Sequence, residues 1–535
     1  MSGLGVFISV VLASLVSRNA GWIISDDRFM SMVNLEHYYV IEENVLSNAD
    51  VLLRDDYFGA EEEEEEEEHL KHAPNLTLFK SVIDETKTVH RLAGPDLEKY
   101  LANPVNVFHL FRRLDSGWRD GLDLLLQTKP CRRWNVPSMA GRLQYLKTKL
   151  PGKTEMKRVV EYIATLQKLY KLNANDIVKG RIGVATSLKP LNLDEQFDIV
   201  KIFHDRDDMH IALEWLNYIL KLLISYNSTQ SGQLGFKVTD VLNLMASAHY
   251  HMKNIPDALK VTEKVLQLDP SNMIAENNLN FFKRKLKALE ENSEDEKRLT
   301  APPTEELSKY EKLCSRRKRK ALKKKCWVAR AGLTFFKVEP IRDRPYVVMV
   351  HDVIPKNTAE NLKKYAYETQ TNSAWYREEV YYPPKFNIGL ESNAVKGKLV
   401  KLYFRQVTQS LELLSTALNR RTLSWRKLHL ANIGQHGMHL EKYKNLLELK
   451  TEKEFKRKEV GAYFIFLNEV KKGGQVVLTD HNISVLPEQG SVLFYLPSQS
   501  KMQSFCPVVG EFLWVAVQPV VEVAKDFCVD ADEWL

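Results

Sequence analysis

The sequence lacks an apolar run long enough to cross a membrane: the longest, Leu4–Val16, is shorter than the roughly 20 residues that a helical span requires. The chain also lacks a large excess of charge of either sign, because 76 Lys and Arg residues nearly balance 69 Asp and Glu residues and leave a formal net charge of +7 over 535 residues. An acidic run, Glu61–Glu68, and a basic run, Arg316–Lys325, are typical of solvated segments whose like charges repel. A nucleic-acid interpretation of the basic run conflicts with the secretory features described next. We therefore expect neither a membrane span nor a nucleic-acid partner.

The first residues, Met1–Ala20, have the composition of a signal peptide, with an apolar stretch followed by small residues. A buried N-terminal helix is the alternative interpretation. The last four residues, Asp-Glu-Trp-Leu, differ from a KDEL-type retrieval signal. Glycosylation sequons begin at Asn75, Asn227 and Asn482, which fits a glycoprotein of the secretory pathway.

Hydrophobic patterning changes along the chain and predicts several domains. Apolar residues at three- and four-residue steps predict helices in the first half, whereas short β-branched and aromatic runs predict strands near the end. Those strands, with helices expected at 357–370 and 398–419, favour a double-stranded β-helix, a relative of the jelly roll. The predicted divisions are a signal peptide (1–20), a helical N-terminal region (21–180), a tetratricopeptide-like repeat domain (190–290), a charged linker (291–330) and the double-stranded β-helix domain (331–535).

Small residues near Pro270 indicate a helical repeat. When Pro270 is aligned as the closing proline of a repeat unit, these small residues fall where two antiparallel helices would approach closely. Two such units bury little core alone, so flanking helices must cap them. Tyr250 is either a ligand-facing aromatic or a core residue. The aligned packing positions are Ala246, Ala248 and Ala258, and, in an earlier and looser unit, Ala212, Trp215, Leu216 and Ile219.

Several segments resemble the collagen prolyl 4-hydroxylase α subunit family: Asn103–Trp118, Tyr310–Cys314, Tyr346–Pro355, Leu428–Gly437, Gly473–Val477, Ser484–Tyr495 and Cys506–Trp514. The resemblance implies a dioxygenase fold that uses Fe(II), 2-oxoglutarate and ascorbate. It also implies self-dimerisation through the N-terminal helices, a repeat that binds an extended peptide with Tyr250, and protein disulfide isomerase as a partner. The implied location is the endoplasmic reticulum lumen, or the exterior of the cell if the chain is secreted.

The family holds iron with two histidines and one aspartate, which leaves positions open for the co-substrate and oxygen. Two registers are possible here for the first His and the Asp. Counting forward from the Ala-Asn pair of Leu428–Gly437 places Lys442 and Lys444 there, and two ammonium groups would repel a cation. Counting backward from the Gly-Gly pair places His439 and Glu441 there and keeps a weak two-ligand site. Both registers remain open.

The distal part of the family site has changed in one direction, from polar ligands to weak or apolar ones. No histidine follows His481, and Gln503 stands at the position of the distal histidine. Leu513 stands at the position of the lysine that binds the 2-oxoglutarate carboxylate. Val477 and Ile433 replace a threonine and a tyrosine. We therefore predict a non-catalytic relative that needs no cofactor. The alternatives are an active procollagen-proline 4-dioxygenase and a secreted structural or binding protein.

Cysteine is sparse, with five residues in the chain. Proximity and the resemblance suggest that Cys314 pairs with Cys326 and that Cys506 pairs with Cys528, which leaves Cys131 over. Spacing alone leaves the connectivity open.

Overall fold

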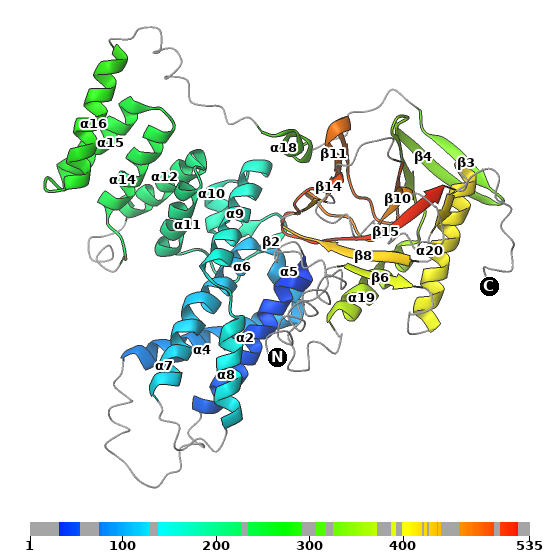
Figure 1. Cartoon of the computed structure of the whole chain (residues 1–535), viewed down its shortest axis with the longest axis horizontal. Coiled ribbons are helices and arrows are strands. Elements are labelled where there is room, and N and C mark those ends of the chain that lie inside the picture. Colours follow the sequence, from blue (N-terminus) through cyan, green and yellow to red (C-terminus); the bar gives the residue numbers. More distant parts are fainter. Residues whose placement is uncertain are drawn as a thin grey trace, which may run out of the picture. The chain divides into compact units, whose positions relative to one another are not determined.

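The structure is a computed structural model (Figure 1). It describes residues 31–53, 74–128, 137–225, 234–290, 307–316, 325–371, 387–391, 398–419, 422–424, 427–435, 437–439, 459–496 and 503–522. The chain forms two compact units. The helical unit comprises Leu35–Ser315 with Val509–Phe512, and the barrel unit comprises Met1–Asn34, Arg316–Val508 and Leu513–Leu535. Predicted features at 1–20 and Glu61–Glu68 lie outside the described residues. None of the described helices is long and apolar enough to span a bilayer.

The first half of the helical unit is a packed set of helices (Figure 1). Its core is formed by large side chains such as Phe108, Phe111 and Trp118. A small hairpin, β1 (Arg181–Ile182) and β2 (Ala185–Thr186), follows. The helices are α2 (Met32–Leu53), α4 (Pro74–Ala93), η2 (Gly94–Asp96), α5 (Leu97–Ala102), α6 (Pro104–Arg112), the π-helical turn η3 (Arg113–Trp118), α7 (Arg119–Thr128), α8 (Pro137–Lys149), α9 (Lys153–Tyr170) and α10 (Ala174–Val178).

Helix α6 begins directly after the buried Asn103. The Asn103 side-chain oxygen accepts a hydrogen bond from Val105 N at 2.9 Å, and its Nδ2 donates to Gly180 O at 2.8 Å. Pro104 then occupies the first helical turn, where a missing N–H costs nothing. One amide therefore caps the helix and ties it to the turn before β1.

Replacing Asn103 by alanine is expected to lower the free energy of unfolding of the helical unit by about 2–3 kcal/mol, since a helix cap is lost together with the buried hydrogen bond to Gly180 O, which keeps only its bond from Ser187 N. Urea denaturation followed by circular dichroism measures the change. Asn173→Ala is the matched control, because Asn173 caps α10 from an exposed position and should cost about 1 kcal/mol. Equal losses in the two variants would contradict the second role of Asn103.

The second half of the helical unit is the predicted repeat, in which consecutive antiparallel helices pack in pairs. The small and aromatic residues assigned to packing are buried, including Trp215, Ala246 and Ala258. A fifth helix follows the second pair and covers its open side, as a capping helix must. The helices are α11 (Leu193–Asp205), α12 (Met209–Ser225), α14 (Val238–His251), α15 (Ile255–Leu268) and α16 (Met273–Glu290), and α18 (Lys309–Cys314) ends the unit.

The barrel unit contains two antiparallel sheets. The larger has the order β3-β4-β5-β13-β10-β15-β8-β6, with β7 paired to β15, and the smaller has the order β12-β11-β14-β9. Non-consecutive neighbours, such as β10 between β13 and β15, are typical of a jelly roll. The strands are β3 (Trp327–Ala331), β4 (Thr334–Arg342), β5 (Tyr346–His351), β6 (Asn387–Glu391), β7 (Thr422–Ser424), β8 (Lys427–Ile433), β9 (Met438–His439), β10 (Glu459–Phe466), β11 (Val476–Leu478), β12 (Ile483–Val485), β13 (Val492–Leu496), β14 (Gln503–Phe505) and β15 (Leu513–Glu522).

Alternation along the strands of the larger sheet creates two cores. Phe464 and Leu493 belong to the inner core, which also takes residues from the smaller sheet. Their neighbours Ile465 and Phe494 point to the opposite face and pack with helices α19 (Lys356–Thr371) and α20 (Lys398–Ala417). The predicted fold class, helical regions followed by a double-stranded β-helix, is confirmed.

Candidate functional site

The first candidate site is the interior of the barrel, between the two sheets. Leu513 begins β15 and pairs with Ile433 of β8. Both side chains have no solvent exposure and belong to the inner core. The Cδ2 atom of Leu513 packs closely on Gly474: a Cβ atom added to Gly474 would lie only 3.1 Å from it. The position that the sequence analysis matched to a co-substrate lysine is therefore a tightly packed apolar one.

Residues of the smaller sheet complete the inner core opposite Leu513. Val476 and Leu478 of β11, Val485 of β12 and Phe505 of β14 are buried in it. A 2-oxoglutarate dianion would need cationic or hydrogen-bonding partners to leave water. The residues at this position do not fit its carboxylate.

The predicted metal positions are only partly described. His439 forms β9 and pairs with Ser504, and Gln503 pairs with Leu478 across β14 and β11. Glu441, Lys442 and Lys444 lie outside the described residues. The choice between the two registers therefore stays a prediction. Within the described ranges, no cluster of three or more His, Cys, Asp or Glu side chains is arranged to hold a metal ion.

The second candidate site is a face shared by α11, α14 and α16, which we call the repeat face and define by His204, Ser247, Tyr250, His251 and Phe281. The half-buried Tyr250 contacts Phe281 with ring centroids 5.4 Å apart. His204 Nε2 lies 2.8 Å from Ser247 Oγ, and its ring centroid is 5.7 Å from that of His251. Burial, reinforced by His251, lowers the pKa of His204. This face therefore combines aromatic surface with neutral hydrogen-bonding groups.

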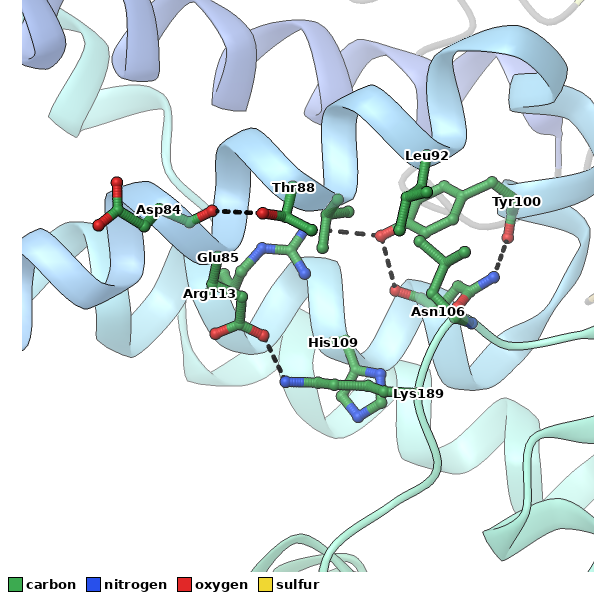
Figure 2. Close-up of a pocket in the computed structure, with 11 residues that line it drawn as sticks. Asp84, Glu85, Thr88, Leu92, Tyr100, Asn106, His109, Arg113 and Lys189 are labelled. Atoms are coloured by element: carbon green, nitrogen blue, oxygen red, sulfur yellow. Dashed lines mark hydrogen bonds and ion pairs between the residues drawn. The ribbon is translucent and has the colours of Figure 1, made fainter.

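A third candidate site is a pocket of about 390 Å³ in the first half of the helical unit (Figure 2). Its base contains a buried ion pair, in which Arg113 Nε and Nη2 each donate to a carboxylate oxygen of Glu42 at 2.8 Å. Burial alone would raise the pKa of Glu42, but the Arg113 guanidinium and the hydrogen bond from His90 together outweigh it, and the pKa lies below its ordinary value. The lining residues are Asp84, Glu85, Thr88, Val89, Leu92, Tyr100, Asn106, His109, Arg113, Leu188 and Lys189.

Two family models match the helical unit. The prolyl 4-hydroxylase α-subunit N-terminal region matches residues 65–183, and the prolyl 4-hydroxylase peptide-substrate-binding domain matches residues 193–288. Prolyl 4-hydroxylase subunit alpha-1 of Homo sapiens is 22% identical over 485 residues, which covers 81% of this chain and 85% of the relative. Subunit alpha-3 of Homo sapiens is 22% identical over 464 residues, with 80% and 83% covered. The chain belongs to the prolyl 4-hydroxylase α subunit family.

Solved structures similar to this family member include a collagen prolyl hydroxylase from Paramecium Bursaria Chlorella virus-1. It is 9% identical, covers 35% of this chain and 95% of its own, and has a TM-score of 0.25. A Pseudomonas putida prolyl-4-hydroxylase is 10% identical, covers 33% and 93%, and has a TM-score of 0.23.

The cysteines of this prolyl 4-hydroxylase α subunit relative differ from the predicted pairing. Cys314 and Cys506 are each disulfide-bonded, whereas Cys326 is a free, exposed thiol. The predicted Cys314–Cys326 bridge is therefore wrong. Cys314 is buried at the end of α18, and Cys326 stands in solvent just before β3, so closeness in sequence did not bring the sulfurs together. Cys131 and Cys528 lie outside the described residues.

The sequon asparagines have different settings. Asn482 is exposed, and its Oδ1 accepts a hydrogen bond from Arg316 Nη2 at 2.7 Å. Asn75 lies in the first turn of α4, and Asn227 lies outside the described residues. Glycosylation at all three stays a prediction.

Sequence reasoning missed the third site and most of the repeat face. His109 and Arg113 lie in the predicted family segment, but their partners Glu195 and Glu42 are 86 and 71 residues away. The available signal was a group of polar residues inside an otherwise apolar helix. Periodicity alone does not identify such distant partners.

Proposed function

We propose that this chain is a non-catalytic α subunit-like protein of the secretory pathway, which retains association and peptide-binding roles and does not hydroxylate proline. The observation that supports this most strongly is Leu513, fully buried in the inner core at the position of the family's co-substrate lysine. Leucine offers no charge-assisted hydrogen bond to a carboxylate. Charge that enters an apolar core without a partner is strongly disfavoured.

The metal positions support the same proposal. Gln503 at the distal position would offer an amide oxygen in place of an imidazole, which is a poor ligand for a divalent transition metal. In the forward register, Lys442 and Lys444 would repel a cation. In the other register, His439 and Glu441 supply at most two ligands.

A peptide-binding role is supported by the match of residues 193–288 to a peptide-substrate-binding domain and by the character of the repeat face. The rings of Tyr250 and Phe281 offer rigid apolar surface, which suits an extended peptide. His204 and Ser247 add polar groups that can hydrogen-bond to backbone or polar side chains. We infer that the face accepts an extended peptide with little preference for proline.

Tyr250→Ala is expected to weaken the binding of a fluorescent extended peptide about tenfold, because it removes a rigid aromatic contact. Fluorescence anisotropy with a repeating Pro-Pro-Gly peptide, and with a proline-free peptide of equal length, measures the loss. Tyr250→Phe should bind as the wild type does, since it keeps the ring packing against Phe281. Leu268→Ala is the control, because Leu268 is an exposed residue of α15 outside the repeat face, and its loss should leave peptide binding unchanged. Unchanged binding by Tyr250→Ala would contradict this role.

Partners and location follow from the family. We infer association with protein disulfide isomerase, self-association through the N-terminal helices, and residence in the endoplasmic reticulum lumen, with glycosylation at the sequons. Co-purification of the tagged full chain with the isomerase supports this arrangement. Recovery of a monomer from the medium would favour a secreted structural or binding protein.

The decisive experiment co-expresses the full chain with protein disulfide isomerase and measures 2-oxoglutarate decarboxylation with Fe(II), ascorbate and a proline-rich peptide. We expect an intact complex without turnover. A catalytically competent human α subunit in the same complex is the positive control. Turnover that disappears in His439→Ala would contradict the proposal and establish an active dioxygenase.

A further inference from the structure

The pocket in the first half of the helical unit has the size and composition of a ligand site. Its volume of about 390 Å³ lies within the range of small-molecule pockets. The apolar side chains of Val89, Leu92 and Leu188 line it. Glu85 and Lys189, which pair with each other, also line it (Figure 2). A compact apolar body would fit between the apolar side chains.

One hydrogen-bond donor in the pocket is already fixed in direction. The Nε and Nη2 atoms of Arg113 are held by Glu42, and Nη2 also lies 3.5 Å from the Tyr100 hydroxyl. Nη1 makes no hydrogen bond within the described part of the chain, although Arg113 lines the pocket. Because the guanidinium is planar and clamped on one edge, its Nη1 donors are preorganised for a ligand oxygen.

One acceptor accompanies this donor. His109 Nε2 lies 3.3 Å from Glu195 Oε2, and burial lowers the pKa of His109, which keeps the ring neutral. A neutral imidazole that faces a carboxylate through Nε2 carries its proton there, so Nδ1 has a free lone pair. Among the described residues, Nδ1 has no hydrogen-bond partner, and His109 lines the pocket.

The donor and the acceptor lie one helical turn apart. His109 and Arg113 are separated by four residues, a spacing that places Cβ atoms about 5–6 Å apart on one helix face. A primary carboxamide presents a carbonyl acceptor and an N–H donor on one carbon. It can therefore engage both groups at once. A ligand carboxylate would fit less well. One of its oxygens would face the lone pair of His109 Nδ1, and it would gain little from Arg113, whose charge is already neutralised by Glu42.

We propose that this pocket binds a small carboxamide carried on an apolar ring, with its carbonyl on Arg113 Nη1, its amino group on His109 Nδ1 and its ring between Val89, Leu92 and Leu188. This site is separate from the barrel and from the repeat face. Neither family match assigns it a ligand. Its test needs no catalytic activity.

Fluorine NMR titrations of the full chain with para-fluorobenzamide, para-fluoroacetophenone and para-fluorobenzoate test the head group, because the three probes share one ring. The amide is expected to bind in the millimolar range or tighter, consistent with its few atoms. The ketone keeps the carbonyl but lacks the N–H, and we expect it to bind about tenfold more weakly. The carboxylate is expected to bind more weakly still.

Leu92→Trp tests the location, because Leu92 is 56% exposed and a larger side chain there covers the pocket without entering the core. It should abolish amide binding, whereas Leu268→Trp, at a position 61% exposed on α15, should not. Circular dichroism of both variants verifies the fold. The proposal is overturned if the benzoate binds as well as the amide, if Leu92→Trp leaves binding unchanged, or if no probe binds.

Discussion

Replacing Arg113 by methionine is expected to lower the free energy of unfolding of the helical unit by about 3–5 kcal/mol, because it removes the guanidinium from the buried Glu42 carboxylate and leaves it only His90 Nε2, at 3.0 Å. The Arg113 and Glu42 side chains are almost fully excluded from solvent, at 7% and 0% exposure. The measurement is urea denaturation of the full chain, followed by circular dichroism. Arg181→Met is the control, since its pair with Asp176 is exposed and such pairs contribute little.

The electrostatic origin of this loss has a pH signature. The folded-state pKa of Glu42 lies below its ordinary value of 4.5, so the wild type has the pair's stability above that value and loses it as pH falls through the folded pKa. In Arg113→Met, burial favours the protonated Glu42 carboxyl and only the His90 hydrogen bond opposes it, so acid relieves the penalty. The gap between the two proteins should shrink on acidification. A gap independent of pH would contradict the ion-pair explanation. A second change, Glu42→Leu, should restore much of the stability.

Replacing Leu513 by lysine is expected to destabilise the barrel unit by several kcal/mol without creating 2-oxoglutarate binding, because an ammonium group would enter the inner core unpaired. Thermal unfolding with and without 2-oxoglutarate measures both effects. In a catalytic relative, a lysine at this position would have the 2-oxoglutarate carboxylate as its partner. Here its neighbours are Ile433 across the strand pair and the apolar side chains of β11 and β12.

Leu513→Met is the matched control, since it nearly conserves volume and should cost less than about 1.5 kcal/mol. A Leu513→Lys protein with wild-type stability and a 2-oxoglutarate-dependent rise in melting temperature would contradict the proposal that the barrel is non-catalytic. Loss of stability in both variants would show that shape, and not charge, limits this position.

The barrel was accessible to sequence reasoning because β-branched and aromatic runs, and segments that resemble the family, occur throughout the last part of the chain. β10, β11, β13 and β15 lie near the end of the chain, where strands were expected, and α19 and α20 lie where helices were expected. Leu513 and Ile433 were predicted to be apolar filler, and both are buried in the inner core.

Contacts between distant residues were less accessible. Nothing in the local pattern of Glu42 or Arg113 indicates that they form a pair, since burial of an ion pair depends on tertiary packing. The cysteines show the same limit, because Cys326 is close to Cys314 in sequence and nevertheless remains a free thiol. The aromatic contact of Tyr250 with Phe281 depends on how α16 packs beside α14, which repeat alignment alone leaves open.

A residue near the start of the described chain is hydrogen-bonded to strand β8 inside the barrel unit. Met32 N donates to Asn432 Oδ1 at 2.7 Å, and both residues are 1% exposed. During synthesis, Met32 leaves the ribosome 400 residues before its acceptor. The native barrel is therefore completed late in translation, after the helical unit has been made. A fragment that begins at Arg316 would expose the Asn432 carboxamide, so barrel stability is best measured on the full chain.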